Sequence, residues 1–230
     1  MQVLKQLPKN LLGRDFVVGD VHGYYAELMQ ALDKVKFDFC RDRLVAVGDL
    51  IDRGPDSYPC LQLVNESWFF SVQGNHERLM QLSLAGDDSA TQVWQKHGGG
   101  WALLYSEAEL HDMTALMEAK MPLAIELSYA EQRLGIVHAE VPDDDWAVLK
   151  NWQGDITQAL LDATTLIRNR LHKKLEHPVA NINAVVCGHT LVKYPTRLGN
   201  VHYLETGICA PQIQGYLSLM QVEQLLNTEI

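Results

Sequence analysis

The sequence predicts an α/β fold arranged as a two-sheet αββα sandwich, with a parallel βαβαβ N-terminal half and a more antiparallel C-terminal half. Up to about residue 86, short apolar runs alternate with amphipathic segments, which is typical of a parallel sheet covered by helices. Beyond that point a hairpin pattern and several short apolar runs follow. The chain has 230 residues, 47% of them hydrophobic, which suffices for a sizeable core, so a single domain is expected over 1–230.

The N-terminal half is predicted to contain three strand–helix units. In the first of its helices, Leu28, Leu32 and Val35 share one face, as an amphipathic helix requires. The expected elements are, in order, a strand at 16–19, a helix at 24–35, a strand at 44–47, a helix at 58–65, a strand at 69–72 and a helix from about His76.

The C-terminal half begins with a predicted hairpin. Its two strands, 123–127 and 134–137, flank the segment Ala130-Glu131-Gln132. The other expected elements are a helix at 156–175 and strands at 184–187, 201–204 and 217–222.

Composition narrows the classes of protein that fit. A net charge of −10 argues against extended nucleic-acid binding, which needs a basic stripe. No apolar run approaches the ~20 residues of a membrane span, and the first ten residues lack the apolar core of a signal peptide. The four cysteines form no CxxC pair and are expected to be reduced. A cytoplasmic protein without membrane or nucleic-acid partners is therefore expected, and the sequence indicates no particular oligomeric state.

Polar side chains follow five of the predicted strands. In isolation each has an ordinary structural explanation: Asp20 can cap a helix, Asn75 can be a helix N-cap, and His138 or His189 can be a hydrogen-bonded core histidine. Together they predict one site, because open α/β sheets bind ligands outside the carboxyl ends of their strands. The five segments are GDVHG (19–23), GDLIDRG (48–54), GNHE (74–77), VHAE (137–140) and GHT (188–190).

The predicted site is a cluster of imidazole and oxygen donors without a thiolate. Such donors suit two divalent or trivalent metal ions rather than a structural zinc. With two metals one carboxylate usually bridges, and the donors divide naturally around Asp49. The six candidate ligands are Asp20, His22, Asp49, Asn75, His138 and His189.

These segments resemble the signature of the phosphoprotein phosphatase branch of the calcineurin-like metallophosphoesterases, and most of all the small bacterial and bacteriophage-lambda-type serine/threonine protein phosphatases. HGGGW (97–101) and YLETG (203–207) are similar to segments of the phage-type enzymes, and the resemblance runs from about Phe16 to Val222. Eukaryotic relatives usually carry a glycine pair where this chain has Ala139-Glu140. We interpret that departure as a loop variation of the small bacterial type.

The resemblance implies a first metal at Asp20 and His22, a bridging Asp49, and a second metal at the other three candidate ligands. The expected metal is manganese, with iron or zinc as alternatives. The implied activity is hydrolysis of phosphoserine and phosphothreonine in proteins, extending to phosphotyrosine, by direct attack of a hydroxide that bridges both metals. Phosphoprotein substrates are the expected partners.

Further residues are expected to handle the leaving group and the phosphate. An alkoxide leaving group needs an acid, and His76, raised in pKa by Asp52, is the candidate. Planar arginines suit the non-bridging phosphate oxygens, and we expect Arg53 and Arg168 in that role, with Arg170 as the alternative to Arg168. His97 has no assigned role, and the loop 207–215 is expected to lie over the metals and contribute to substrate docking.

The alternative function keeps the chemistry and changes the substrate to dinucleotide polyphosphates, as in the bis(5'-nucleosyl)-tetraphosphatases, whose first segment is nearly identical. That group is expected to lack the aspartate before the arginine and to carry Asp after GNH, where this chain has Asp52 and Glu77. A catalytically inactive interaction module is disfavoured, because every candidate metal and acid position is intact.

Overall fold

A computed structural model describes residues 2–151 and 168–227 of the chain. Its first sheet has the strand order β10-β2-β3-β4. The strands β2 (Asp15–Val18), β3 (Arg43–Ala46) and β4 (Phe69–Ser71) are parallel, as the sequence predicted. The strand β10 (Leu219–Gln221) returns from the C-terminal half and pairs with β2 in the antiparallel sense.

The second sheet has the order β1-β5-β6-β7-β9-β8. The predicted hairpin is confirmed, because β5 and β6 pair in the antiparallel sense, as do β8 and β9. The pairs β1–β5, β6–β7 and β7–β9 are parallel, so among the described strands this sheet is mixed. Its strands are β1 (Leu4–Leu7), β5 (Ala124–Tyr129), β6 (Gln132–Val137), β7 (Ala184–Cys187), β8 (Thr196–Leu198) and β9 (Val201–Tyr203).

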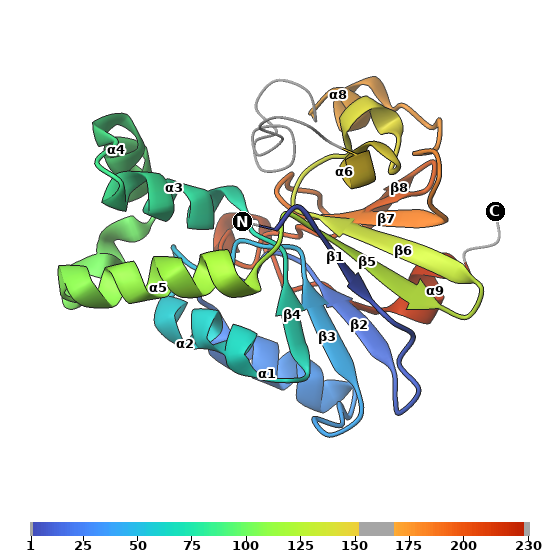
Figure 1. Cartoon of the computed structure of the whole chain (residues 1–230), viewed down its shortest axis with the longest axis horizontal. Coiled ribbons are helices and arrows are strands. Elements are labelled where there is room, and N and C mark those ends of the chain that lie inside the picture. The colour runs from blue at the N-terminus through green and yellow to red at the C-terminus, as the bar shows by residue number, and fades with distance from the viewer. Residues whose placement is uncertain (1, 152–167, 228–230) are drawn as a thin grey trace.

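The two sheets face each other and carry helices on their outer faces, which confirms the αββα sandwich (Figure 1). Valines of β2 and β3 pack against isoleucines and leucines of β5 and β6 between the sheets. Outside the first sheet lie α1 (Tyr25–Lys34), α2 (Ser57–Gln62) and α5 (Glu107–Lys120). Leu28 and Leu32 of α1 are fully buried there, and each such side chain contributes about 1.5–3 kcal/mol to the free energy of unfolding. Outside the second sheet lie α6 (Val148–Asn151) and α8 (Arg168–Lys173).

The structure differs from the predicted elements in several places, and the strands β1 and β8 are among the elements that were not predicted. Residues 87–122, for which no element was predicted, form α4 (Asp88–Lys96) and α5, which follow α3 (Asn75–Leu84). The predicted strand 217–222 stops at Gln221, because Val222 begins α9 (Val222–Leu226), where the Gln224 side chain accepts the backbone N–H of Gln221. Of the predicted helix 156–175, residues 156–167 lie outside the described part of the chain.

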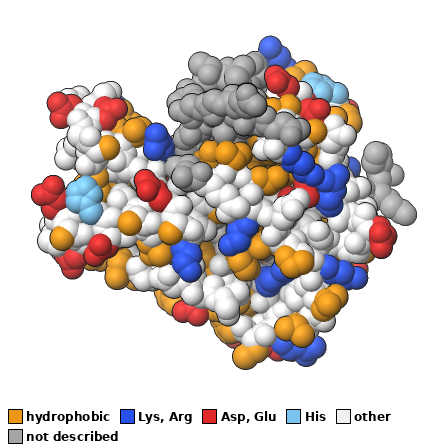
Figure 2. Space-filling view, in the orientation of Figure 1, with side chains coloured by type: hydrophobic (Ala, Val, Ile, Leu, Met, Phe, Trp, Pro, Cys, Tyr) orange, Lys and Arg blue, Asp and Glu red, His pale blue; other side chains and the backbone are white. Residues whose placement is uncertain are grey.

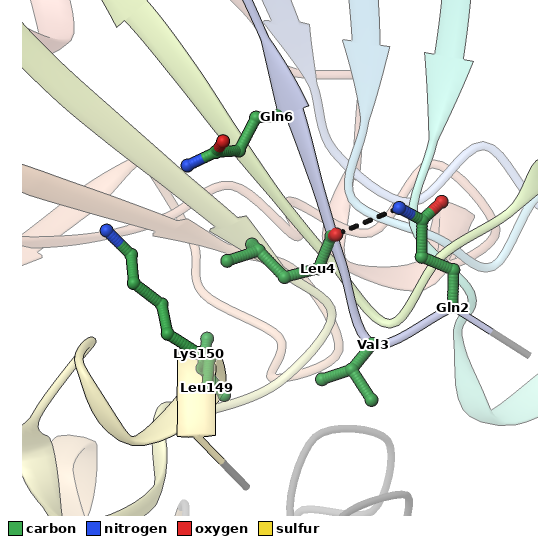
Figure 3. A pocket seen from close by; sticks show the side chains of 6 residues that line it. All are labelled: Gln2, Val3, Leu4, Gln6, Leu149 and Lys150. Carbon is green, nitrogen blue, oxygen red and sulfur yellow. Dashed lines mark hydrogen bonds between the residues drawn. The ribbon is translucent and has the colours of Figure 1, made fainter.

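The surface of the described chain has an uneven distribution of charge and one pocket of note. Figure 2 shows acidic side chains gathered over α4 and α5, whereas basic side chains are dispersed over the rest of this face. A pocket of about 550 Å³ lies between β1 and α6 (Figure 3), and its lining includes Gln2, Gln6 and Lys150 but none of the predicted site residues. None of the helices in the described ranges is both long and apolar enough to cross a membrane.

Candidate active site

The carboxyl ends of strands from both sheets meet at one place, and their polar side chains contact each other there. The backbone N–H of His189, after β7, donates to Asp20, after β2. The backbone N–H of His76, after β4, donates to Asp49, after β3, at 3.0 Å. The ring of His138, after β6, faces the Val47 carbonyl. The predicted convergence of five segments is therefore present.

Two histidines turn the lone pair of Nε2 toward Asp49. Nδ1 of His22 lies 3.0 Å from the Ile51 carbonyl oxygen, and Nδ1 of His138 lies 2.8 Å from that of Val47. Because a carbonyl only accepts, Nδ1 carries the proton and Nε2 carries the lone pair in both rings. These Nε2 atoms lie 3.7 and 3.5 Å from Asp49 Oδ2. Burial lowers the pKa of both histidines, that of His22 to about 3, so a cation among these atoms would stabilise the arrangement.

A second group of potential ligand atoms lies beside the first. Oδ1 of Asn75 is 2.9 Å from His138 Nε2 and 2.7 Å from His189 Nδ1. The two ring nitrogens are 3.1 Å apart. An amide oxygen and two imidazole nitrogens converging in this way are typical of a metal site built from nitrogen and oxygen donors.

Buried negative charge gathers around these donors. Asp20, Asp49 and Glu205 are all buried, and burial together with the charges of Glu205 and Asp49 raises the pKa of Asp20 well above its usual value. Burial also raises the pKa of Glu205 to about 7. For Asp49 burial acts in the same direction, but the surrounding histidines prevail and lower its pKa. Closely spaced buried carboxylates with few cations fit multivalent metal ions, so the residues present fit the metal pair that the resemblance implies.

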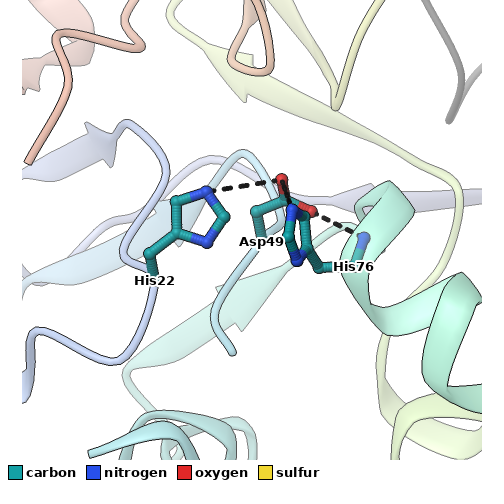
Figure 4. Close-up of side chains that lie close together, drawn as sticks. All are labelled: His22, Asp49 and His76. Atoms are coloured by element: carbon teal, nitrogen blue, oxygen red, sulfur yellow. Dashed lines mark hydrogen bonds and ion pairs between the residues drawn. The ribbon is translucent and has the colours of Figure 1, made fainter. Parts of the chain in front are cut away.

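The donor atoms form two compact groups that share Asp49. Those of His22, Asp49 and His76 lie within 4.8 Å of one another (Figure 4), and so do those of Asp49, His138 and His189. The first group contains His76 where the sequence predicted Asp20. Both Asp20 oxygens accept the backbone N–H of His189 at 3.1 Å, so the segment after β7 holds this carboxylate at the same edge of the sheets.

The backbone of the site is strained. Five of its residues have φ angles in the left-handed region, where a Cβ atom costs about 1–2 kcal/mol: His22 (47°), Asp49 (50°), Asp52 (72°), Arg53 (69°) and His189 (59°). Only glycine fits before Asn75 and before His189. A Cβ on Gly74 would collide with the Asp49 carboxylate, and a Cβ on Gly188 would collide with the Asp20 carboxylate.

His76 and Asp52 form the predicted pair. Nδ1 of His76 lies 2.6 Å from Asp52 Oδ2, and both side chains are buried. Burial disfavours the charged imidazole, but the carboxylates of Asp49 and Asp52 prevail and raise the pKa of His76. The sequence did not predict that two indoles, Trp94 and Trp101, also donate to the Asp52 carboxylate. The similarity of the HGGGW segment to the phage-type enzymes was the available signal for Trp101.

Arg53 emerges into the centre of the site. Its Nη1 donates to His22 Nε2 at 2.7 Å, and its Nη2 donates to His76 Nε2 at 2.9 Å. Nη1 also lies 3.4 Å from Cys209 Sγ, which brings the 207–215 loop to the site as expected. His97 lies outside it, exposed and with Nδ1 facing the Val93 carbonyl.

The two other candidate phosphate-binding arginines, Arg168 and Arg170, both belong to α8. The backbone of Arg168 begins α8, but its side chain lies outside the described part of the structure. Arg170, the alternative, is 2% exposed and donates to Asp144 and to the carbonyls of Leu175 and His177. Its guanidinium is therefore committed to holding this region together and does not contact the site.

Glu77 joins two of the site segments. Its Oε2 accepts the backbone N–H of Gly74 at 2.7 Å and that of Asp49 at 3.0 Å, and its Oε1 accepts that of Leu50 at 2.8 Å. The carboxylate is fully buried, so it satisfies three donors that water cannot reach. Glu77 thereby fixes the segment after β3 against the first turn of α3.

Comparisons with known proteins agree with this geometry. A family model described as calcineurin-like phosphoesterase matches residues 16–193. Serine/threonine-protein phosphatase 1 of Salmonella typhimurium is 33% identical over 212 residues, which cover 90% of this chain and 91% of that protein. An asymmetrical bis(5'-nucleosyl)-tetraphosphatase of Halalkalibacterium halodurans is 32% identical over 146 residues, which cover 56% and 58% of the two chains. A solved structure provisionally described as a diadenosine tetraphosphatase shares the fold, with a TM-score of 0.62 at 24% identity, covering 97% of this chain and 95% of its own.

Proposed function

The chain belongs to the calcineurin-like phosphoesterase family, and on that premise we propose that this hydrolase removes phosphate from phosphoserine and phosphothreonine in proteins, and from phosphotyrosine as well. The observation that carries the proposal is the buried His76–Asp52 pair at the edge of the donor cluster. A phosphoserine ester releases a poorly stabilised alkoxide, so an acid at the leaving oxygen matters greatly. Cleavage of a phosphoanhydride releases a stabilised phosphate, so an acid brings little there.

Each residue has a proposed task. Asp20, His22, Asp49, Asn75, His138 and His189 would hold two metal ions, for which we propose manganese. When bound, such a pair supplies activation of water near neutral pH and neutralisation of the phosphate charge.

The remaining tasks concern the substrate directly. Nδ1 of His76 is held by Asp52, so its Nε2 faces the site; it accepts from Arg53 in this structure and, protonated once Arg53 turns to the phosphate, gives a proton to the leaving oxygen. Arg53 exchanges its contacts with His22 and His76 for non-bridging phosphate oxygens, which its planar guanidinium can bind in pairs. We propose the same phosphate-binding task for Arg168.

A second candidate substrate is a dinucleotide polyphosphate, favoured by the relative of that name at 32% identity. The test compares kcat/KM for a phosphoserine peptide with kcat/KM for diadenosine tetraphosphate on the manganese-loaded protein. We expect the peptide to be preferred. A preference for the dinucleotide of more than about tenfold, some 1.4 kcal/mol of transition-state free energy, would replace the proposed function by the second candidate.

A further inference from the structure

The carboxylate of Asp52 is surrounded by hydrogen-bond donors. It is 0% exposed, so bulk solvent does not reach it. Oδ2 faces His76 Nδ1 at 2.6 Å and accepts from Trp94 Nε1 at 3.0 Å. Oδ1 accepts from Trp101 Nε1 at 2.6 Å and from Trp94 Nε1 at 3.1 Å. Within the described chain, every donor that the structure gives to Oδ1 is an indole.

The segment that carries the indoles is built to reach Asp52. Trp94 lies in α4, and Trp101 lies in the 3₁₀ turn Gly99–Leu104. Gly98 has φ 120°, and a Cβ there would lie 2.6 Å from the Arg53 backbone nitrogen. A Cβ on Gly99 would lie 2.7 Å from the Trp94 ring. The glycines of HGGGW therefore allow this segment to pack directly against the backbone beside Asp52.

Core packing alone does not account for this arrangement. Trp94 is 4% exposed and belongs to the hydrophobic cluster outside the first sheet, and Trp101 packs at its edge. Packing would be satisfied by any large apolar ring, whereas here both indole N–H groups point at one carboxylate from sequence separations of 42 and 49 residues. Without them Oδ1 would be buried without a donor, and the carboxylate would be free to rotate away from His76.

We propose that Trp94 and Trp101 are positioning residues for the protonation of the leaving group. They hold Asp52 so that it fixes the His76 ring with Nε2 toward the substrate. A hydroxide oxygen bonds to phosphorus as the ester P–O bond breaks; the electron pair of the broken bond goes to the leaving oxygen, which takes the proton from Nε2, while Nδ1–H stays hydrogen-bonded to Asp52. The inference rests on the role of His76 in the proposed function and predicts that the indoles matter most for esters with poor leaving groups.

The experiment measures kcat for Trp101→Phe and Trp94→Phe on phosphoserine peptide, phenyl phosphate and p-nitrophenyl phosphate, with metal content followed by elemental analysis. Phenylalanine keeps a large ring and removes the donor. We expect a loss on the order of tenfold on the peptide and phenyl phosphate, as for one lost hydrogen bond to a charged group, and a clearly smaller loss on p-nitrophenyl phosphate. Metal content should stay at the wild-type level.

The matched control is Trp146→Phe. Its indole also donates to a buried carboxylate, that of Glu126 at 2.7 Å, but in the core outside the second sheet. This variant should keep the wild-type ratio of rates on the three esters. A second control adds Trp101→Phe to Asp52→Asn, which already lacks the acceptor carboxylate, and there the tryptophan change should have little further effect.

The rates on the three esters separate the positioning role of the tryptophans from the identity of the substrate. An equal loss on all three esters in both tryptophan variants, or a full additional loss in the Asp52→Asn background, would overturn the inference. If the aryl esters show the expected selectivity but the peptide is not hydrolysed by the wild-type protein, the proposed substrate is wrong and the positioning role stands. If one tryptophan variant does not fold, the other gives the same comparison.

Discussion

Glu77 is expected to stabilise the active site more than other residues, because it joins the segment after β3 to the start of α3. Replacing it by glutamine tests this directly. The isosteric amide keeps one oxygen, which can still accept from Gly74 and Asp49. Its NH₂ group then faces the N–H of Leu50, so one buried donor loses its acceptor. Burial and the charge of Asp49 raise the pKa of Glu77 to about 7, so loss of the charge itself adds little, and the unsatisfied donor should lower the free energy of unfolding by about 1–3 kcal/mol.

The assay is urea denaturation of the metal-free protein, followed by circular dichroism at constant pH, with metal content measured separately after reconstitution. The chain offers a matched control in Glu109, which occupies the same third position of a capping box in α5 and accepts the Ser106 N–H at 2.8 Å, but is exposed. Glu109→Gln should change the midpoint little. Equal effects of the two substitutions, or a loss of unfolding free energy below about 1 kcal/mol for Glu77→Gln, would refute the argument that burial makes the hydrogen bonds of Glu77 important for stability.

Three other predictions follow from the site and the core. Asp49→Asn should remove most activity and lower the metal content after reconstitution, since Asp49 is shared by both donor groups; retention of two metals per chain in that variant would contradict the shared position. Arg53→Ala should weaken product inhibition by phosphate, and Arg53→Lys should restore little of it, because an ammonium cannot make the paired contact; recovery by lysine would point to a simple charge effect. Burial and the nearby Arg197 lower the pKa of His202 to about 4, so the folded state binds fewer protons than the unfolded state, and stability is lost as pH falls from about 6.5 toward 4. Between pH 7 and 5 this amounts to about 2 kcal/mol, which urea titrations should show as a difference between the wild type and His202→Gln, because buried carboxyls of raised pKa such as Glu205 act in the opposite direction in both proteins.

The sequence predicted the central strands of the fold and the place of the site, because both depend on short apolar runs and on the polar residues that follow them. Each candidate ligand follows an apolar run that becomes a strand, and parallel strands necessarily bring their carboxyl ends to the same edge. The strands β1 and β8 had no such signal, since both are short, lie at sheet edges and carry polar residues such as Gln6 and Arg197. Edge strands need only one apolar face, so their composition does not distinguish them from loops.

Contacts between distant segments could not be read from the sequence. Nothing in the spacing of Trp94 or Trp101 relates them to Asp52, because the contact depends on how the turn after α4 packs on the segment after β3. The same is true of Arg170, whose salt bridge to Asp144 joins two segments that are far apart in the chain. Side-chain direction on a helix is decided by such partners and not by the residue type.

The left-handed backbone at His22, Asp49, Asp52, Arg53 and His189 has a consequence for engineering this enzyme. At about 1–2 kcal/mol each, these conformations oppose folding by several kcal/mol, a large share of the ~5–15 kcal/mol that keeps a protein folded. Glycine adopts the same angles without the Cβ clash, so selection for heat resistance alone would favour glycine at these positions. Every such gain would delete a side chain to which we assign a task in the proposed reaction. Thermal stability and catalytic rate are therefore opposed at these five positions. A selection for heat-stable variants has to measure activity at the same time.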